Sequence, residues 1–283
     1  MSRNRDRMGI PTPQDNSTPP QAQQETAGFS FVVPTEFVEL PSGGRFYPET
    51  HPLYGQTTIE IKQMTAKEED MLTSRTLLKN GVAIERVIQS LIMDKRINPD
   101  SMLVGDRNAV IIAARISGYG SEYNTNVSCP ACGATQEYGI DLHDANVHNG
   151  EIPDVLGVVD NEDGTFTTTL PKTRVQVAFR LLNGADEKNL VSQLENARKR
   201  KRPEQAITTQ IRNMVVSVNG DESIQALNYL IENIPSLDAR HLRVCYREVA
   251  PNIDLTQVFQ CGECGHEQDM EVPLSADFFW PDR

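Results

Sequence analysis

The stretch "VSCPACGATQEYGIDL", residues 127–142, decides the fold, because its two cysteines stand two residues apart between strand-like segments. A second pair with the same spacing, "CGECG", occupies residues 261–265. In each pair the backbone can turn so that both thiolates point at one cation, and the glycine that follows tolerates a positive φ. Together the pairs supply the four thiolates of a tetrahedral structural zinc site: Cys129, Cys132, Cys261 and Cys264.

A redox-active dithiol, a disulfide and unrelated thiols are the alternatives. A redox dithiol needs a reactive thiolate at a helix N-terminus, whereas "YNTNVS" before the first pair and "TQEYGIDL" after it are typical of strands. Disulfides need an oxidising compartment, and the N-terminal residues lack the apolar stretch of an export signal. These arguments favour zinc. His266 offers a nitrogen in place of one sulfur, and Cys245 is expected to be a buried small hydrophobe.

The flanks of the two cysteine pairs match beyond the cysteines, which indicates an internal duplication. At an offset of 132 residues, "CPACGATQEYGIDL" aligns with "CGECGHEQDMEVPL". Upstream, "IKQMTAKEEDML" (61–72) aligns with "FRLLNGADEKNL" (179–190) at an offset of 118. The second copy therefore carries about 14 extra residues, predicted near residues 196–206. The alternative is a chance likeness between short amphipathic segments.

The predicted fold class is α+β, with a duplicated strand-helix-helix-strand unit whose two knuckles join as a zinc-ribbon-like site. The strands "TTIEIKQM" and "TRVQVAFRLL" each precede a helix capped by Thr65 or Asn183. Apolar residues at helical spacing predict buried stripes, at Ile84, Val87, Ile88, Leu91 and Ile92, and at Leu227, Leu230, Ile231 and Ile234. The predicted organisation is a disordered tail (1–28), a first repeat (29–148), a linker or hairpin (149–172) and a second repeat (173–283).

Composition limits the classes of function. The chain has 283 residues, of which 38% are hydrophobic, so it can fill a core, and no apolar run is long enough to span a membrane. Its net charge of -12 opposes broad attraction to nucleic acid. The five histidines fall in no metalloprotease pattern, and P-loop and dinucleotide fingerprints are absent. We therefore predict that the protein is not an enzyme.

Four segments carry candidate contact surfaces. The leading interpretation of the Pro-rich tail, and of the basic run Arg198–Arg202 in "ARKRKRP", is a solvated segment. The alternative for each is a segment that binds a partner. The loop "LPSGGRFYPETHPLYG" (40–55) presents Phe46, Tyr47 and Tyr54, and the C-terminal "ADFFWPDR" presents Phe278, Phe279 and Trp280. These aromatic side chains serve either the protein's own core or a partner interface.

The runs "LPSGGRFYP", "MTAKEEDML", "DRNAVIIAARISGYGSEY" and "CPACG" resemble a known family over Glu36–Leu142. They are similar to the baseplate hub subunit or hub assembly protein of T-even-type contractile-tailed phages. The resemblance implies that the partners are other baseplate and tail hub proteins, and it allows a homo-oligomer. It also implies that the protein acts in the host cytoplasm during assembly or is built into the virion. The runner-up function is a zinc-ribbon module that binds nucleic acid or acts in transcription, and a thiol oxidoreductase is a third class.

Overall fold

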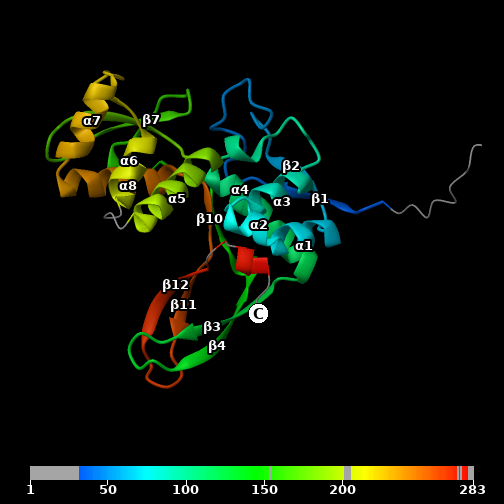
Figure 1. Ribbon diagram of the computed structural model, residues 1–283. Coiled ribbons are helices and arrows are strands. Elements are labelled where there is room, and N and C mark those ends of the chain that lie inside the picture. The colour runs from blue at the N-terminus through cyan, green and yellow to red at the C-terminus, as the bar shows by residue number, and fades with distance from the viewer. Residues whose placement is uncertain (1–31, 153, 201–204, 273, 275, 280–283) are drawn as a thin grey trace, which may run out of the picture. The chain divides into compact units, whose positions relative to one another are not determined.

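A computed structural model describes residues 32–152, 154–200, 205–272, 274 and 276–279. The Pro-rich segment 1–28, residues 201–202 of the basic run, and Trp280 lie outside the described residues. Residues Pro34–Arg283 cluster as one unit, in which helices and strands are mixed as expected of an α+β fold (Figure 1).

The described strands all pair antiparallel, in five small sheets. Four of these sheets have two strands, β1 with β2, β3 with β4, β5 with β10, and β11 with β12, and the fifth has the order β6-β7-β8-β9. The strands are β1 (Thr35–Glu39), β2 (Thr58–Lys62), β3 (Glu122–Ser128), β4 (Thr135–Asp141), β5 (Asn146–His148), β6 (Val159–Asp160), β7 (Thr165–Thr169), β8 (Gln176–Arg180), β9 (Val215–Val218), β10 (Asn252–Asp254), β11 (Thr256–Gln260) and β12 (Glu267–Glu271).

The described helices separate the hairpins that begin and end each half of the chain. They are α1 (Ala66–Thr73), α2 (Arg75–Lys79), α3 (Ala83–Leu91), α4 (Val104–Tyr119), α5 (Gly184–Lys199), α6 (Ala206–Met214), α7 (Ile224–Asn233) and α8 (Ser236–Val249), with short 3-10 turns at Pro99–Ser101, Leu142–Asp144, Asp154–Leu156 and Ala276–Phe279.

Each half starts with a two-stranded hairpin, where the sequence predicted a single strand. The predicted strands are β2 and β8, and they pair with β1 and β7 respectively. Alternate side chains of each strand are buried, Ile59 and Ile61 in β2, and Val177 and Phe179 in β8. The partner strands are as long as β2 and β8, but they were missed because TEFVE and TFTTT lack the alternating apolar residues of β2 and β8 and depend on pairing with a neighbour. β6 and β7 lie in the segment predicted as a linker or hairpin.

A capped helix follows each hairpin, as predicted. Thr65 precedes α1 and Asn183 precedes α5, and in both cases an acidic residue three positions later completes a capping box. In α1 this residue is Glu68, which also forms an ion pair with Lys62 (Nζ to Oε1, 2.7 Å). In α5 it is Asp186, which pairs with Arg180 at 2.7 Å. Each helix is therefore fixed to the strand before it by an ion pair as well as by its cap.

We expect Glu68→Gln to remove a pH-dependent part of the stability. The carboxylate is buried, and although burial raises its pKa, hydrogen bonds from Lys62, Ser90 and Thr65 lower it to about 2. A lowered pKa stabilises the folded chain above the ordinary value of 4.5, and this contribution is lost as the pH falls towards 2. Wild type should exceed the variant by roughly 3 kcal/mol of unfolding free energy at pH 7, and the gap should close in acid.

Urea titrations of wild type and Glu68→Gln between neutral and acid pH measure this difference in unfolding free energy. Protonation of other groups destabilises both proteins equally, so it cancels in the difference. The matched control carries Lys62→Arg, Thr65→Asn and Glu68→Asp, which copies the pair and cap of α5 into α1. The control should keep most of the stability and its pH dependence. A gap between wild type and Glu68→Gln that does not change with pH would contradict the assignment.

The predicted apolar stripes lie in the core. In α3, Val87, Ile88 and Leu91 are buried, and Ile92 directly after the helix is also buried. In α7 the stripe is narrower, because only Leu230 and Ile231 are buried while the outer members pack partly exposed. The 3.6-residue period therefore identified both helices and their inward faces.

Two buried aspartates hold the hairpin turns against the helices. Asp106 of α4 accepts hydrogen bonds from the backbone N–H and hydroxyl of Ser42 and from the Tyr47 hydroxyl (2.7 Å to Oδ2). Asp238 of α8 accepts from the N–H of Lys172 and from Thr173. Tyr47 is only 5% exposed, so of the two roles that its sequence left open it has the core role, because its ring is buried and its hydroxyl is hydrogen-bonded to Asp106.

The C-terminal aromatics also belong to the core. Phe278 and Phe279 are 0% and 1% exposed, and the Phe278 ring lies 5.3 Å from that of Tyr123. The guanidinium of Arg115, itself buried, donates to the carbonyls of Phe278, Gly120 and Glu122. Of the aromatic side chains proposed as contacts and described by the structure, Tyr54 is the most exposed, at 47%.

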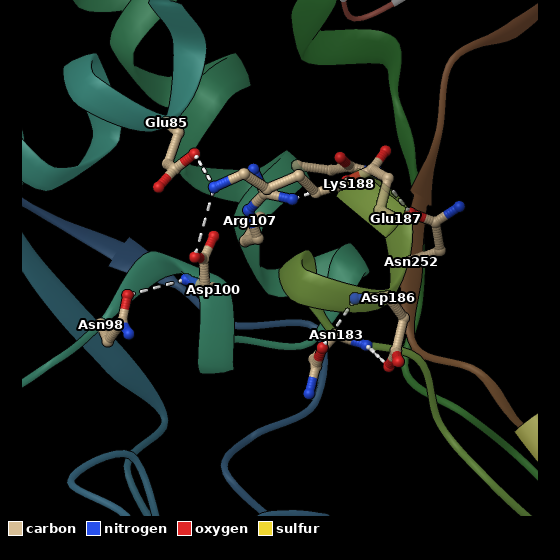
Figure 2. Close-up of polar contacts among 10 residues, drawn as sticks. Glu85, Asn98, Asp100, Arg107, Asn183, Asp186, Glu187, Lys188 and Asn252 are labelled. Atoms are coloured by element: carbon tan, nitrogen blue, oxygen red, sulfur yellow. Dashed lines mark hydrogen bonds and ion pairs between the residues drawn. The ribbon is translucent and has the colours of Figure 1, made fainter. Parts of the chain in front are cut away.

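Polar contacts join the two halves of the chain (Figure 2). Arg107 of α4 pairs with Glu187 of α5 at 2.6 Å, and Lys188 pairs with Glu85 of α3 at 2.8 Å. Next to them, α5 begins against the backbone of residues 99–103, where a Cβ on Gly184 would lie 2.7 Å from the Pro99 carbonyl oxygen. Glycine is needed there because the two backbones approach too closely for any side chain.

Candidate metal centre

The first cysteine pair closes a regular hairpin. β3 and β4 pair from Glu122↔Asp141 to Ser128↔Thr135, and residues 129–134 form the turn. Cys129 N–H donates to the Ala134 carbonyl at 2.8 Å, and Gly133 N–H donates to the Cys129 carbonyl at 2.9 Å. Gly133 has φ of +74°, so this knuckle uses the conformational freedom predicted from its sequence.

The second pair closes a hairpin of the same form. β11 and β12 pair up to Gln260↔Glu267, and Cys261 N–H donates to the His266 carbonyl at 2.9 Å. Gly265 N–H donates to the Cys261 carbonyl at 2.9 Å, and Gly265 has φ of +72°. The two turns therefore present their cysteines in one geometry, although they are more than a hundred residues apart.

The two turns meet and bring four sulfurs together. All four Sγ atoms lie within 4.8 Å of one another, and both the Cys129–Cys264 and Cys132–Cys261 distances are 3.7 Å. A tetrahedron with metal–sulfur bonds of about 2.3 Å has sulfur–sulfur edges of about 3.8 Å, whereas a disulfide bond is about 2.05 Å. The arrangement fits one tetrahedral metal ion and does not fit disulfides.

The two hairpins lie side by side (Figure 1), and residues other than the cysteines also join them. Gln136 of β4 donates from its side chain to the Gln260 carbonyl and accepts from Gly262 N–H at 2.8 Å. The Tyr138 hydroxyl donates to the Val258 carbonyl at 2.9 Å, and the Tyr138 ring packs edge-on against Phe259. These contacts keep the knuckles opposite each other.

The surroundings of the sulfurs favour the thiolate at Cys129, whereas the neighbouring sulfurs and burial raise the pKa of Cys132 and raise that of Cys264 to about 12. Burial alone raises the pKa of the Cys129 thiol, but backbone N–H groups of Cys132 and Ala131 donate to its sulfur and lower the pKa to about 6. Cys129 and Cys261 are each 2% exposed, while Cys132 and Cys264 lie at the surface. An ion held by all four thiolates has no open coordination position, which is the pattern of structural metal sites.

The remaining thiol and imidazole candidates lie outside this cluster. His266 contributes its backbone carbonyl to the second knuckle, and the only group of metal-binding side chains found among the described residues contains cysteines alone. Cys245 is fully buried in α8, as predicted, with its sulfur 3.4 Å from Nε2 of His241. Sequence reasoning missed Gln136, Tyr138 and Phe259, because their cross-hairpin contacts have no signature in local spacing.

Comparisons with known proteins place the chain in a family. A family described as "T4 bacteriophage base plate protein" matches residues 33–280, which is nearly the whole chain. Searches among curated proteins and among solved structures give no match. Among the described residues, the helices are too short or too polar to cross a membrane. Because the match covers both hairpins and the helices between them, this chain belongs to the T4 bacteriophage base plate protein family.

Proposed function

We propose that this baseplate protein is a non-enzymatic structural or assembly component of the tail hub, stabilised by one zinc ion bound to Cys129, Cys132, Cys261 and Cys264. The observation that carries the baseplate part is the family match over residues 33–280. The hub part rests on the resemblance of the segments "LPSGGRFYP" and "CPACG" to hub proteins. Its partners are then other hub and tail proteins, met in the host cytoplasm during assembly.

The geometry of the sulfurs supports zinc as the ion. Four thiolates in a closed tetrahedral set are the preferred ligands of structural zinc, and the two 3.7 Å distances fit its bond length. When bound, zinc would supply folding free energy by joining the hairpins across the 128 residues between Cys132 and Cys261. The closed set also supports a non-enzymatic role, since water has no free position on the ion.

We infer further that the two halves are copies of one unit. Several features recur at the offsets seen in the sequence. The N-caps Thr65 and Asn183 are 118 residues apart, and the ion pair Lys62–Glu68 recurs at the same offset as Arg180–Asp186. The variant that copies the second pair and cap into α1 tests this equivalence. If it loses as much stability as Glu68→Gln, the two environments are not equivalent.

The helices support the same inference and correct its details. Ile92, after α3, bridges to Ile61 of β2, and Val215, after α6, pairs with Phe179 of β8. The counterpart of α3 is therefore α6, and α7 has no counterpart helix in the described part of the first half. The start of α6 follows the start of α5 by five residues more than the start of α3 follows the start of α1. Only these five of the extra residues therefore lie near residues 196–206.

The remaining nine extra residues lie between α6 and α8, where the second half contains β9 and α7. Beyond them the offset is 132, and it relates Asp106 to Asp238, as well as Gly133 to Gly265. The same offset relates Cys129 to Cys261 and Cys132 to Cys264. The Cys129–Cys264 pair therefore corresponds to the Cys261–Cys132 pair, and the Sγ–Sγ distance is 3.7 Å in both. The proposed zinc would then lie on a pseudo-twofold axis between the copies.

The hub assignment is tested in infected cells. An affinity-tagged chain should co-purify with baseplate hub proteins, and a phage without the gene should accumulate particles or intermediates that lack a complete hub. Mass spectrometry of purified virions decides whether the protein remains in the tail. Normal assembly without the gene, or retention of the purified chain on DNA that falls steeply with salt, would overturn the proposal in favour of another role.

A further inference from the structure

A groove lies where the two halves meet. It has a volume of about 790 Å³ and is lined by the start of α4, the two residues that follow β8, one face of α8 and the strand β10. Part of its wall is apolar, from Leu103, Val104, Leu181, Val244 and Pro251. The groove lies outside the cysteine cluster, and neither the proposed zinc site nor the contacts between the hairpins use it.

One helix gives the groove its charge. Arg240, Arg243 and Arg247 of α8 all line it, together with Val244. A helix turns by about 100° per residue, so positions 240, 243, 244 and 247 share one face. The wall contributed by α8 therefore contains a stripe of three arginines with Val244 among them, and Tyr246 and Glu248 line the groove beside this stripe.

Two of these arginines lack a counter-charge within the part of the chain that the structure describes. Arg247 forms an ion pair with its neighbour Glu248 at 2.9 Å, and the Asp254 carboxylate accepts from Thr256 N–H at 2.8 Å, so the nearby acidic groups are engaged. No hydrogen bond or ion pair to Arg240 or Arg243 is found among the described residues, and Nε of Arg243 is buried without an acceptor. Arg240 is exposed, whereas Arg243 is half-buried, so leaving the Arg243 guanidinium without a counter-charge is costly and an incoming anion would satisfy it.

We propose that this groove binds an acidic segment of a partner protein, whose carboxylates pair with Arg240 and Arg243 while its apolar side chains contact Val104 and Val244. The two arginines are about 4.5 Å apart along the axis of α8, a spacing that suits two carboxylates one turn apart on a helix. The inference rests on the proposed function, because it names the chemistry of the partner met during assembly.

Charge and shape favour a peptide over nucleic acid. The net charge of -12, with Glu248 and Asp254 in the groove, opposes an extended run of phosphates, whereas a short peptide has to place only two carboxylates, against Arg240 and Arg243. Two described residues that line the groove carry aromatic rings. Tyr246 accepts a hydrogen bond from Leu182 N–H through its hydroxyl and packs partly buried against the core, and the His148 ring is within hydrogen-bond distance of the Ala250 carbonyl, so neither is an open stacking surface. An amphipathic acidic peptide matches both the apolar and the cationic parts of the wall.

Fluorescence polarisation with the full-length chain tests the groove. The probe is a labelled, end-capped alanine–leucine helix with two glutamates one turn apart, and its twin has glutamine in both places. Wild type should bind the glutamate probe, and Arg240→Gln with Arg243→Gln should weaken binding by about tenfold or more. The matched control is Arg86→Gln, an exposed arginine of α3 outside the groove, which should change nothing.

The other outcomes decide against the proposal. Equal binding of both probes, tighter binding of a single-stranded oligonucleotide, or self-association that the double variant abolishes would each overturn it. Circular dichroism and metal content confirm that the double variant is folded. If this variant restores phage assembly as well as wild type does, the groove inference fails while the hub function stands. If wild type does not associate with tail proteins at all, the hub function fails whatever the peptide result.

Discussion

Replacing Cys129 and Cys261 together by serine is expected to abolish metal binding and to destabilise the protein more than truncation of any single core side chain. Wild-type protein purified without chelator should contain one zinc per chain, and the variant should contain almost none. Structural zinc contributes apparent binding free energy on the order of 10 kcal/mol in small domains. The loss should be smaller in this protein, because the chain also has an extensive hydrophobic core.

Metal analysis and thermal unfolding with and without chelator measure this effect. The matched control is Cys245→Ala, which removes the one cysteine that lies outside the cluster and should leave zinc content unchanged. Chelator should lower the unfolding temperature of wild type and of the control, and leave the double variant unaffected. A variant that still holds metal, or a wild type without it, would rule out the four-sulfur assignment.

Phe278→Ala is expected to destabilise the protein by about 3–5 kcal/mol, the range found for large aromatic side chains truncated in cores. The ring is fully buried between Tyr123 and Phe279, with centroid distances of 5.3 and 5.8 Å, so truncation leaves a cavity. The backbone carbonyl of Phe278 also accepts from Arg115, so movement of this segment would leave a buried guanidinium less well satisfied.

Urea unfolding of Phe278→Ala compared with Tyr54→Ala measures the difference. Tyr54 is 47% exposed and its loss should change stability by less than about 1 kcal/mol. If Phe278→Ala is as stable as wild type but no longer binds tail proteins, Phe278 is an interface residue and its assignment to the core is wrong. Unfolding of the variant with zinc still bound would agree with its place in the core.

The sequence alone determined the features that depend on near neighbours. Two cysteines separated by two residues and followed by glycine predicted both knuckles, because a tight turn with positive φ at Gly133 and Gly265 needs that residue. The capping boxes at Thr65 and Asn183 and the stripe of α3 were predicted for the same reason, since each involves residues within about one helical turn.

Only the tertiary structure decided what depends on distant segments. An aromatic in a Pro- and Gly-rich loop has the same local pattern whether it faces the core or a partner, so the burial of Tyr47 against Asp106 could not be predicted. The strand β1 is specified by its pairing with β2, and Gln136 meets its partners only when the hairpins come together. The groove at Arg243 likewise exists only because segments more than a hundred residues apart in sequence fold against one helix, and no local spacing encodes that contact.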